Sequence, residues 1–120
     1  AIILHIVEKE DWERAERAGQ YRPASLEKDG FIHCSTTDQV LNVANARFRG
    51  CEGLVLLCID STRVASSLRW ENVEGGTILF PHVYASLRPD SVVAAVAFEP
   101  TQSGQFTLPK AVADLCRTAG

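Results

Sequence analysis

The chain has 120 residues, of which 46% are hydrophobic and 22% charged, and its formal net charge is −3 with histidine neutral. These values are typical of one globular domain, residues 1–120, that buries a core without disulfide or metal staples. They give no basic face for duplex nucleic acid, and no apolar run approaches the roughly 20 residues that span a bilayer. We therefore expect a cytoplasmic protein that binds neither duplex nucleic acid nor a membrane.

The first half of the chain alternates strand and helix patterns. Apolar residues over 2–7 predict a strand that His5 interrupts. Residues 9–18 predict a helix, because apolar side chains recur along them at three-residue spacing. A short strand is expected over 31–34, followed by a second helix that ends near Gly50.

The second half of the chain is mostly strand-like. Strands are expected over residues 54–59, 68–71, 77–80, 92–98 and 106–108. The runs 54–59 and 92–98 are apolar on both alternating faces, which favours buried strands. Pro109 is placed to begin a C-terminal helix. This order predicts an α+β fold in which two to three helices pack on a split or mixed β-sheet.

The four cysteines have no spacing typical of a metal site or a disulfide framework, which favours reduced thiols. A zinc ion held by His33, Cys34 and His82 is disfavoured, because neighbouring residues of a strand point to opposite faces. We expect no metal. A Cys34 nucleophile assisted by His82 is a minor alternative, since the sequence offers no visible oxyanion partner.

The first polar motif, residues 30–36, places His33 at the end of a strand and two hydroxyls before a helix. Thr36 and Gln39 have the spacing of a capping box. Because backbone N–H groups at a helix start attract anions, Ser35 and Thr36 could hold a phosphate there. His33 could contact a ribose or orient the reacting group. A purely structural alternative stays open, in which the hydroxyls cap the helix and His33 satisfies a backbone carbonyl.

The second polar motif, residues 80–84, places His82 and Tyr84 on one face of an extended strand. This pair could bracket a flat ring, or it could be a half-buried aromatic strand with its polar tips in water. Glu71 could act as a base or bind ribose hydroxyls, and Arg22 could clamp a carboxylate or phosphate. Alternatively, Glu71 is a solvated surface acid and Arg22 is a surface ion-pair partner.

These motifs resemble those of a known family. The pattern consists of Gly30-Phe31-Ile32-His33-x-Ser35-Thr36, Gln39, Leu56-Leu57, Trp70-Glu71, Gly75-Gly76 and Phe80-Pro81-His82-Val83-Tyr84. It is similar to a small bacterial domain of unknown function, number nine-fifty-two, and the similarity extends from the first strand to about Phe98. Members of that family resemble, in fold, the ADP-ribosyltransferases and the NAD-dependent RNA phosphotransferases.

The resemblance implies a fold like that of the ADP-ribosyltransferases, with NAD as a candidate ligand. His33 and Ser35 match the strand histidine and hydroxyl that contact the NAD ribose and nicotinamide in those enzymes, with Cys34 where glycine is common. By the same resemblance, Tyr84 would stack on nicotinamide, and Glu71 would stabilise the cation formed as the glycosidic bond breaks.

The leading hypothesis is therefore a nucleotide-using enzyme, similar to an ADP-ribosyltransferase or phosphotransferase, with its site between the two histidine motifs. The expected catalytic residues are His33, Glu71 and His82, and the expected ligand-binding residues are Arg22, Ser35, Thr36 and Tyr84. The alternative is a non-catalytic module that binds a small anionic metabolite through the same residues. Both require the two histidines to reach one cavity.

Overall fold

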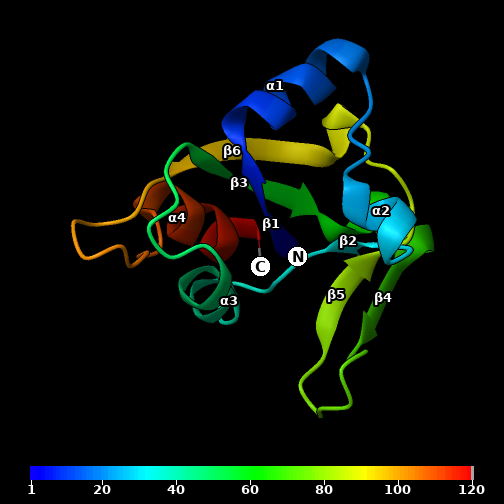
Figure 1. The fold of residues 1–120 in the computed structure, drawn as a ribbon. Helices are drawn as coiled ribbons and strands as arrows, with labels where there is room; N and C mark the ends of the chain where they lie inside the picture. Colours follow the sequence, from blue (N-terminus) through cyan, green and yellow to red (C-terminus); the bar gives the residue numbers. More distant parts are fainter. Residues whose placement is uncertain (120) are drawn as a thin grey trace.

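Two three-stranded antiparallel sheets organise the computed structural model, which describes residues 1–119 (Figure 1). The first, here called the central sheet, has the order β1 (Ile2–Glu8), β3 (Leu54–Asp60), β6 (Val92–Phe98). β3 is buried from Leu54 to Ile59 because it has a neighbour on each side and side chains packed on both faces. This confirms the buried strand expected there.

The strand β6 differs from its expectation. It lies at the edge of the central sheet, and its residues alternate between partly buried and exposed up to Phe98. Val93, for example, is 45% exposed. An apolar run therefore does not guarantee burial on both faces, because small residues such as Ala95 and Ala97 cost little when water reaches them.

Helices cover both faces of the central sheet. α1 (Lys9–Ala18) has the predicted bounds, buries Trp12 and Ala15, and ends at Gly19 with a positive φ of 76°. On the opposite face lie α3 (Val40–Arg47) and α4 (Lys110–Ala119), seen beside the central sheet in Figure 1. No helix within residues 1–119 is both long and apolar enough to cross a membrane.

The second sheet, here called the outer sheet, has the order β2 (Ile32–His33), β5 (Phe80–Val83), β4 (Leu68–Glu71). Two short helical segments flank it, α2 (Ala24–Lys28) and η1 (Ser61–Ser67), whereas η2 (Pro89–Ser91) leads into β6 of the central sheet. Leu4 of β1 and Ser35 exchange two backbone hydrogen bonds of 2.8 Å, which join the outer sheet to the central one. The β4–β5 hairpin projects away from the rest of the chain (Figure 1).

Four expectations need correction. Within residues 1–119, the sheet is split and wholly antiparallel, so a mixed sheet is wrong, and four α-helices replace the expected two to three. Residues 77–79 are not strand, because the carbonyls of Ile78 and Leu79 accept hydrogen bonds from the side chains of Asn72 and Gln39. Residues 106–108 are not strand either, because the Phe106 N–H donates to a side chain of α3.

Candidate functional site

A cavity of about 300 Å³ lies where the two sheets meet, with walls from β1, β2, β5, α3 and the turn of the β4–β5 hairpin. Its size is at the lower end of roughly 300–1,000 Å³ for small-molecule sites. Most of its wall is apolar, and the polar side chains include His33, His82, Ser25 and Ser35. A mostly apolar wall with a few polar groups is typical of ligand-binding cavities.

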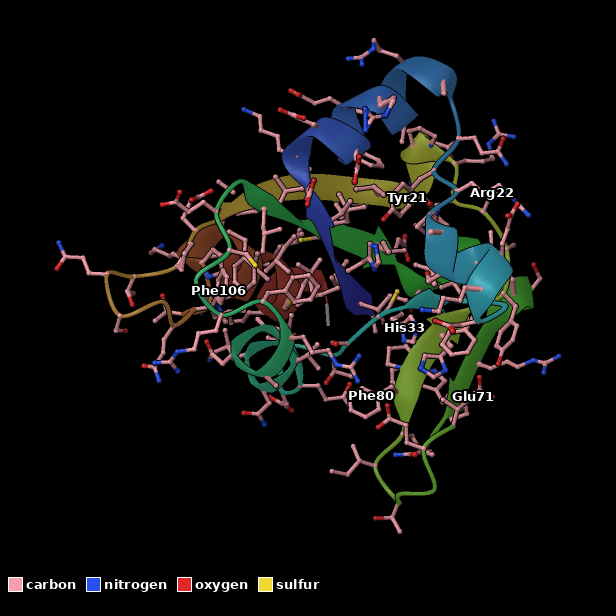
Figure 2. All side chains as sticks on the ribbon, in the orientation of Figure 1. Tyr21, Arg22, His33, Glu71, Phe80 and Phe106 are labelled. Carbon is pink, nitrogen blue, oxygen red and sulfur yellow. The ribbon has the colours of Figure 1, made fainter. Side chains whose placement is uncertain are left out.

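The two motif histidines meet in this cavity. His33 of β2 and His82 of β5 are direct partners in the antiparallel ladder, so their side chains project to the same face. Their ring centroids lie 5.6 Å apart in an edge-on arrangement, and both rings line the cavity. Figure 2 shows His33 among the side chains of the outer sheet, near Phe80 and Glu71. The two histidines therefore reach one cavity, as both functional hypotheses require.

Glu71 holds His82 in place. The Nδ1–H of His82 donates to Glu71 Oε1 over 3.0 Å, and the hydroxyl of Tyr84 donates to the same oxygen. These bonds, that from Tyr84 first, lower the pKa of Glu71 below its ordinary value and raise that of Tyr84. His82 and Tyr84 thus share a face, as alternation along a strand predicts.

The orientation of His82 leaves its other ring nitrogen free. Its Nε2 has no hydrogen-bond partner within residues 1–119, although the residue is only 4% exposed. The carboxylate on Nδ1 favours the tautomer in which Nε2 accepts a proton. Phe31 stacks on the ring at 4.0 Å between centroids and limits its movement.

Ser35 presents a second open polar group to the cavity. The residue is 6% exposed, and its hydroxyl makes no hydrogen bond to the described part of the chain. Its backbone is fixed by the pairing with Leu4, so the hydroxyl has a defined position. No fully buried side-chain nitrogen or oxygen lacks a hydrogen-bond partner within the described residues, so the Ser35 hydroxyl and His82 Nε2 both reach the solvent of the cavity and are open to a ligand.

His5 supports the site from the central sheet, a role that the sequence analysis missed. Its Nδ1–H donates to the backbone oxygen of His33 over 2.6 Å, and its Nε2 accepts from the hydroxyl of Tyr21 over 2.7 Å. Burial lowers the pKa of His5 to about 4, so the ring stays neutral near pH 7. A histidine inside an otherwise apolar strand was the signal that could have revealed it.

Three predicted ligand-binding residues do not line the cavity. Arg22 lines a separate depression beside α1 and lies 3.7 Å from Glu27. Figure 2 shows Arg22 and Tyr21 apart from Glu71 and Phe80. Tyr84 lies behind Glu71 and beneath the guanidinium of Arg69, which is 4.7 Å from its ring centroid.

Thr36 begins the turn that leads into α3, and its backbone N–H is engaged within the chain. Its N–H donates to Gln39 Oε1 over 3.0 Å, which forms one half of the predicted capping box. The N–H groups of Gln39 and Val40 both donate to the Thr36 carbonyl. Three of the backbone donors at this turn, those of Thr36, Gln39 and Val40, are therefore used within the chain.

Cys34 and the histidines do not assemble a metal site. Within residues 1–119, no group of three or more His, Cys, Asp or Glu side chains could hold a metal ion. Cys34 is buried on the cavity wall, and burial raises the pKa of its thiol to about 12. A thiol with so high a pKa is a poor nucleophile at neutral pH. His33 turns its Nε2 to Asp29 Oδ2 at 2.9 Å, which lowers the pKa of that carboxyl.

A charged pair at the cavity was not anticipated. Arg47, the last residue of α3, lies 3.3 Å from Glu74 in the β4–β5 turn, and both residues line the cavity. The two residues are 27 positions apart, so no local pattern in the sequence relates them.

Comparison with known proteins finds relatives of the same size. A family model described as "Protein of unknown function (DUF952)" matches residues 6–95. The crystal structure of protein CC0527 from Caulobacter crescentus is 31% identical and has a TM-score of 0.85, covering 94% of this chain and 99% of that one. Its solution NMR structure is 30% identical, with a TM-score of 0.80 and 97% coverage of both chains. No curated protein matches, and none of these relatives is described as an ADP-ribosyltransferase.

Proposed function

Because the chain belongs to the DUF952 family, whose description carries no activity, we propose a function from the cavity itself. The cavity binds a small nucleotide-like substrate, with NAD as the leading candidate, and His82 moves a proton during group transfer from it. This function follows the resemblance to ADP-ribosyltransferases. The observation that carries it is the open Nε2 of His82, a buried imidazole that Glu71 orients toward use as a base.

Binding is supported by the two open polar groups on the cavity. The Ser35 hydroxyl and His82 Nε2 can each form a hydrogen bond to a ribose or an amide. The apolar wall and the ring of Phe80 suit a flat heterocycle. His33, on the same face, is available as a further contact through its Nδ1.

The proposed chemistry uses His82 as the base and Glu71 as its positioning residue. The acceptor, a hydroxyl or an amine, bonds to the ribose carbon and gives its proton to Nε2, while nicotinamide leaves with the electrons of the broken bond. Glu71 stabilises the resulting imidazolium, which then loses the proton to water. Glu71 acts through His82 here, because its carboxylate lies behind that ring and does not line the cavity.

A non-catalytic binding module is the second candidate. Its specific support is that the cavity wall offers no activated nucleophile, since the Cys34 thiol is buried with a pKa of about 12. In that case Ser35 and the histidines would hold a small anionic metabolite without turnover. Measuring binding and turnover separately discriminates the two functions.

The test is a calorimetric titration of NAD, paired with chromatographic measurement of nicotinamide release. We expect His33→Ala to weaken NAD binding. Glu71→Gln keeps the shape of the hydrogen bonds but removes the charge, so release should fall by about 10²–10⁴-fold while binding changes little. Glu13→Gln, an exposed carboxylate on α1, is the matched control and should behave as wild type.

Two results would redirect the proposal. Binding without release, in the presence of water and small hydroxyl or amine acceptors, would favour the binding module. No heat with NAD at concentrations that detect millimolar affinity (about 4 kcal/mol) would reject the NAD hypothesis.

A further inference from the structure

Within the described residues, the cavity wall carries one arginine, Arg47, and no lysine. This guanidinium comes from the last turn of α3 and is 63% exposed, so it lies where the cavity opens to water. His82 and Ser35 are buried residues of the same wall, 4% and 6% exposed. The cavity therefore combines buried hydrogen-bonding side chains with one exposed guanidinium.

Arg47 is paired with Glu74, and that pair is readily broken. The Glu74 side chain is 75% exposed, and its Oε1 is the only carboxylate oxygen paired with Arg47 within residues 1–119. Exposed ion pairs of this kind contribute little to stability, because water screens them and two long side chains must be ordered. An anion that enters the cavity could displace Glu74 at small cost.

The turn that contains Glu74 is ordered by hydrogen bonds to the side chain of Asn72. Asn72 Oδ1 accepts hydrogen bonds of 2.9 Å from the backbone N–H groups of Glu74 and Gly76, and its Nδ2–H donates to the Ile78 carbonyl. Gly75 has a φ of 87°, which side chains disfavour, and a Cβ on Gly76 would lie 2.9 Å from Asn72 Nδ2. The sequence of this turn thus holds one carboxylate opposite Arg47.

We propose that Arg47 recognises one phosphate group of the ligand, and that Glu74 occupies Arg47 until that phosphate arrives. This inference rests on the proposed function and names its substrate class: a nucleotide whose heterocycle and ribose lie inward and whose phosphate reaches the mouth. A single guanidinium suits a single phosphate, since its planar fork can donate two hydrogen bonds to one group. Within the described residues the wall has no second arginine and no lysine, which disfavours longer polyanions.

The test compares AMP with adenosine, which differ only by the phosphate, in calorimetric titrations of the full chain. Wild type should bind AMP at least about tenfold more tightly than adenosine, the effect of one charge-assisted hydrogen-bonded contact. Arg47→Ala should abolish that preference, and Glu74→Gln should increase AMP affinity several-fold by freeing the guanidinium. Arg88→Ala is the matched control, because Arg88 is an exposed arginine paired with Asp90 at 3.7 Å and does not line the cavity.

The outcomes separate this inference from the function on which it rests. Equal binding of AMP and adenosine by wild type would overturn the role of Arg47 while leaving a nucleoside site. Preserved discrimination in Arg47→Ala would overturn it as well. If neither AMP, adenosine nor NAD binds, the proposed function fails. The phosphate site at Arg47 is then tested separately by adding inorganic phosphate. Phosphate-induced NMR shifts in residues 72–76 that Arg47→Ala removes would uphold the phosphate site, and their absence would overturn it.

Discussion

The hydroxyl of Tyr84 controls the charge of Glu71 more than any other single contact. It donates to the carboxylate, and this bond is the leading reason that the pKa of Glu71 lies below its ordinary value. We predict that Tyr84→Phe raises the pKa of Glu71 toward that ordinary value. Carbon-13 NMR titration of the Glu71 carboxyl measures the shift directly, and an unchanged pKa would contradict the prediction.

The same bond links Glu71 to stability in acid. A carboxyl whose pKa is lower in the folded than in the unfolded chain contributes stability above its unfolded pKa. That contribution disappears as the pH falls through the folded value. Tyr84→Phe should therefore be less stable than wild type at neutral pH, and this difference should shrink as the pH falls through the folded pKa of Glu71.

His5 also makes stability depend on pH, because burial disfavours its protonated form in the folded chain. Its pKa is about 4 in the folded chain and 6.5 as the ordinary value, so the unfolded chain binds the proton first as the pH falls. Stability should decrease between pH 6.5 and pH 4 by roughly 3 kcal/mol from this residue alone. We predict that His5→Asn, which can still donate to the His33 carbonyl, loses that pH dependence. Urea unfolding at several pH values between 6.5 and 5 measures it.

The comparison between wild type and variant isolates His5 from other groups. Asp29 and Glu71 have pKa values lowered below their ordinary ones, so they change little above pH 5. His5→Asn should be less stable than wild type at pH 7, because it loses the contact with Tyr21. A slope equal to that of wild type would show that His5 is protonated in the folded chain.

At the scale of elements, the sequence predicts those features that depend only on residues close to one another in the chain. The bounds of α1 and β4 follow from the sequence, since the spacing of apolar side chains and a glycine end fix a helix without tertiary help. The common face of His82 and Tyr84 follows from strand alternation. The start of β5 at Phe80 does not follow from the local sequence. The carbonyls of the two residues before it accept hydrogen bonds from the side chains of Asn72 and Gln39, which belong to other segments.

The candidate site was predictable only in part for the same reason. The pairing of His33 with His82 depends on the register of a two-residue strand, which no local pattern specifies. The sequence already showed Arg47 and Arg49 as a local basic cluster that could hold one phosphate group, but the pairing of Arg47 with Glu74 became visible only through the fold. Arg22 was selected by its residue type, and the structure places it on another surface.

The β4–β5 turn depends on one side chain. Asn72 satisfies two N–H groups and one carbonyl in the turn, so Asn72→Ala should leave the turn disordered while the strands persist. We predict faster amide hydrogen exchange at Glu74 and Gly76, with little change in β3. Equal protection of those two amides in the variant would contradict this role for Asn72.

At the scale of the whole molecule, the core consists of two layers separated by the central sheet. Leu57 belongs to the layer beneath α1 and the outer sheet, whereas Leu56 belongs to the layer beneath α3 and α4. Both are fully buried. We predict that Leu56→Ala and Leu57→Ala each cost about 2–5 kcal/mol of unfolding free energy.

These two variants also test whether residues 1–120 fold as one domain. Both layers share β3, so each substitution should shift one common unfolding transition seen by circular dichroism and by Trp12 fluorescence. Trp12 lies in the Leu57 layer. A Leu56→Ala transition that leaves the Trp12 signal unchanged would show that the two layers unfold separately.

The position of β6 at the edge of the central sheet affects how this chain would aggregate when it unfolds. Its sequence, Val-Val-Ala-Ala-Val-Ala-Phe, has no charge and no proline, and one side of the strand has no partner in the sheet. Such segments are the ones that assemble into amyloid-like stacks when they are released from a fold. Heat or acid that opens the central sheet would therefore expose a ready template for aggregation. A lysine in place of Val93, which already faces water, would be the natural protective substitution.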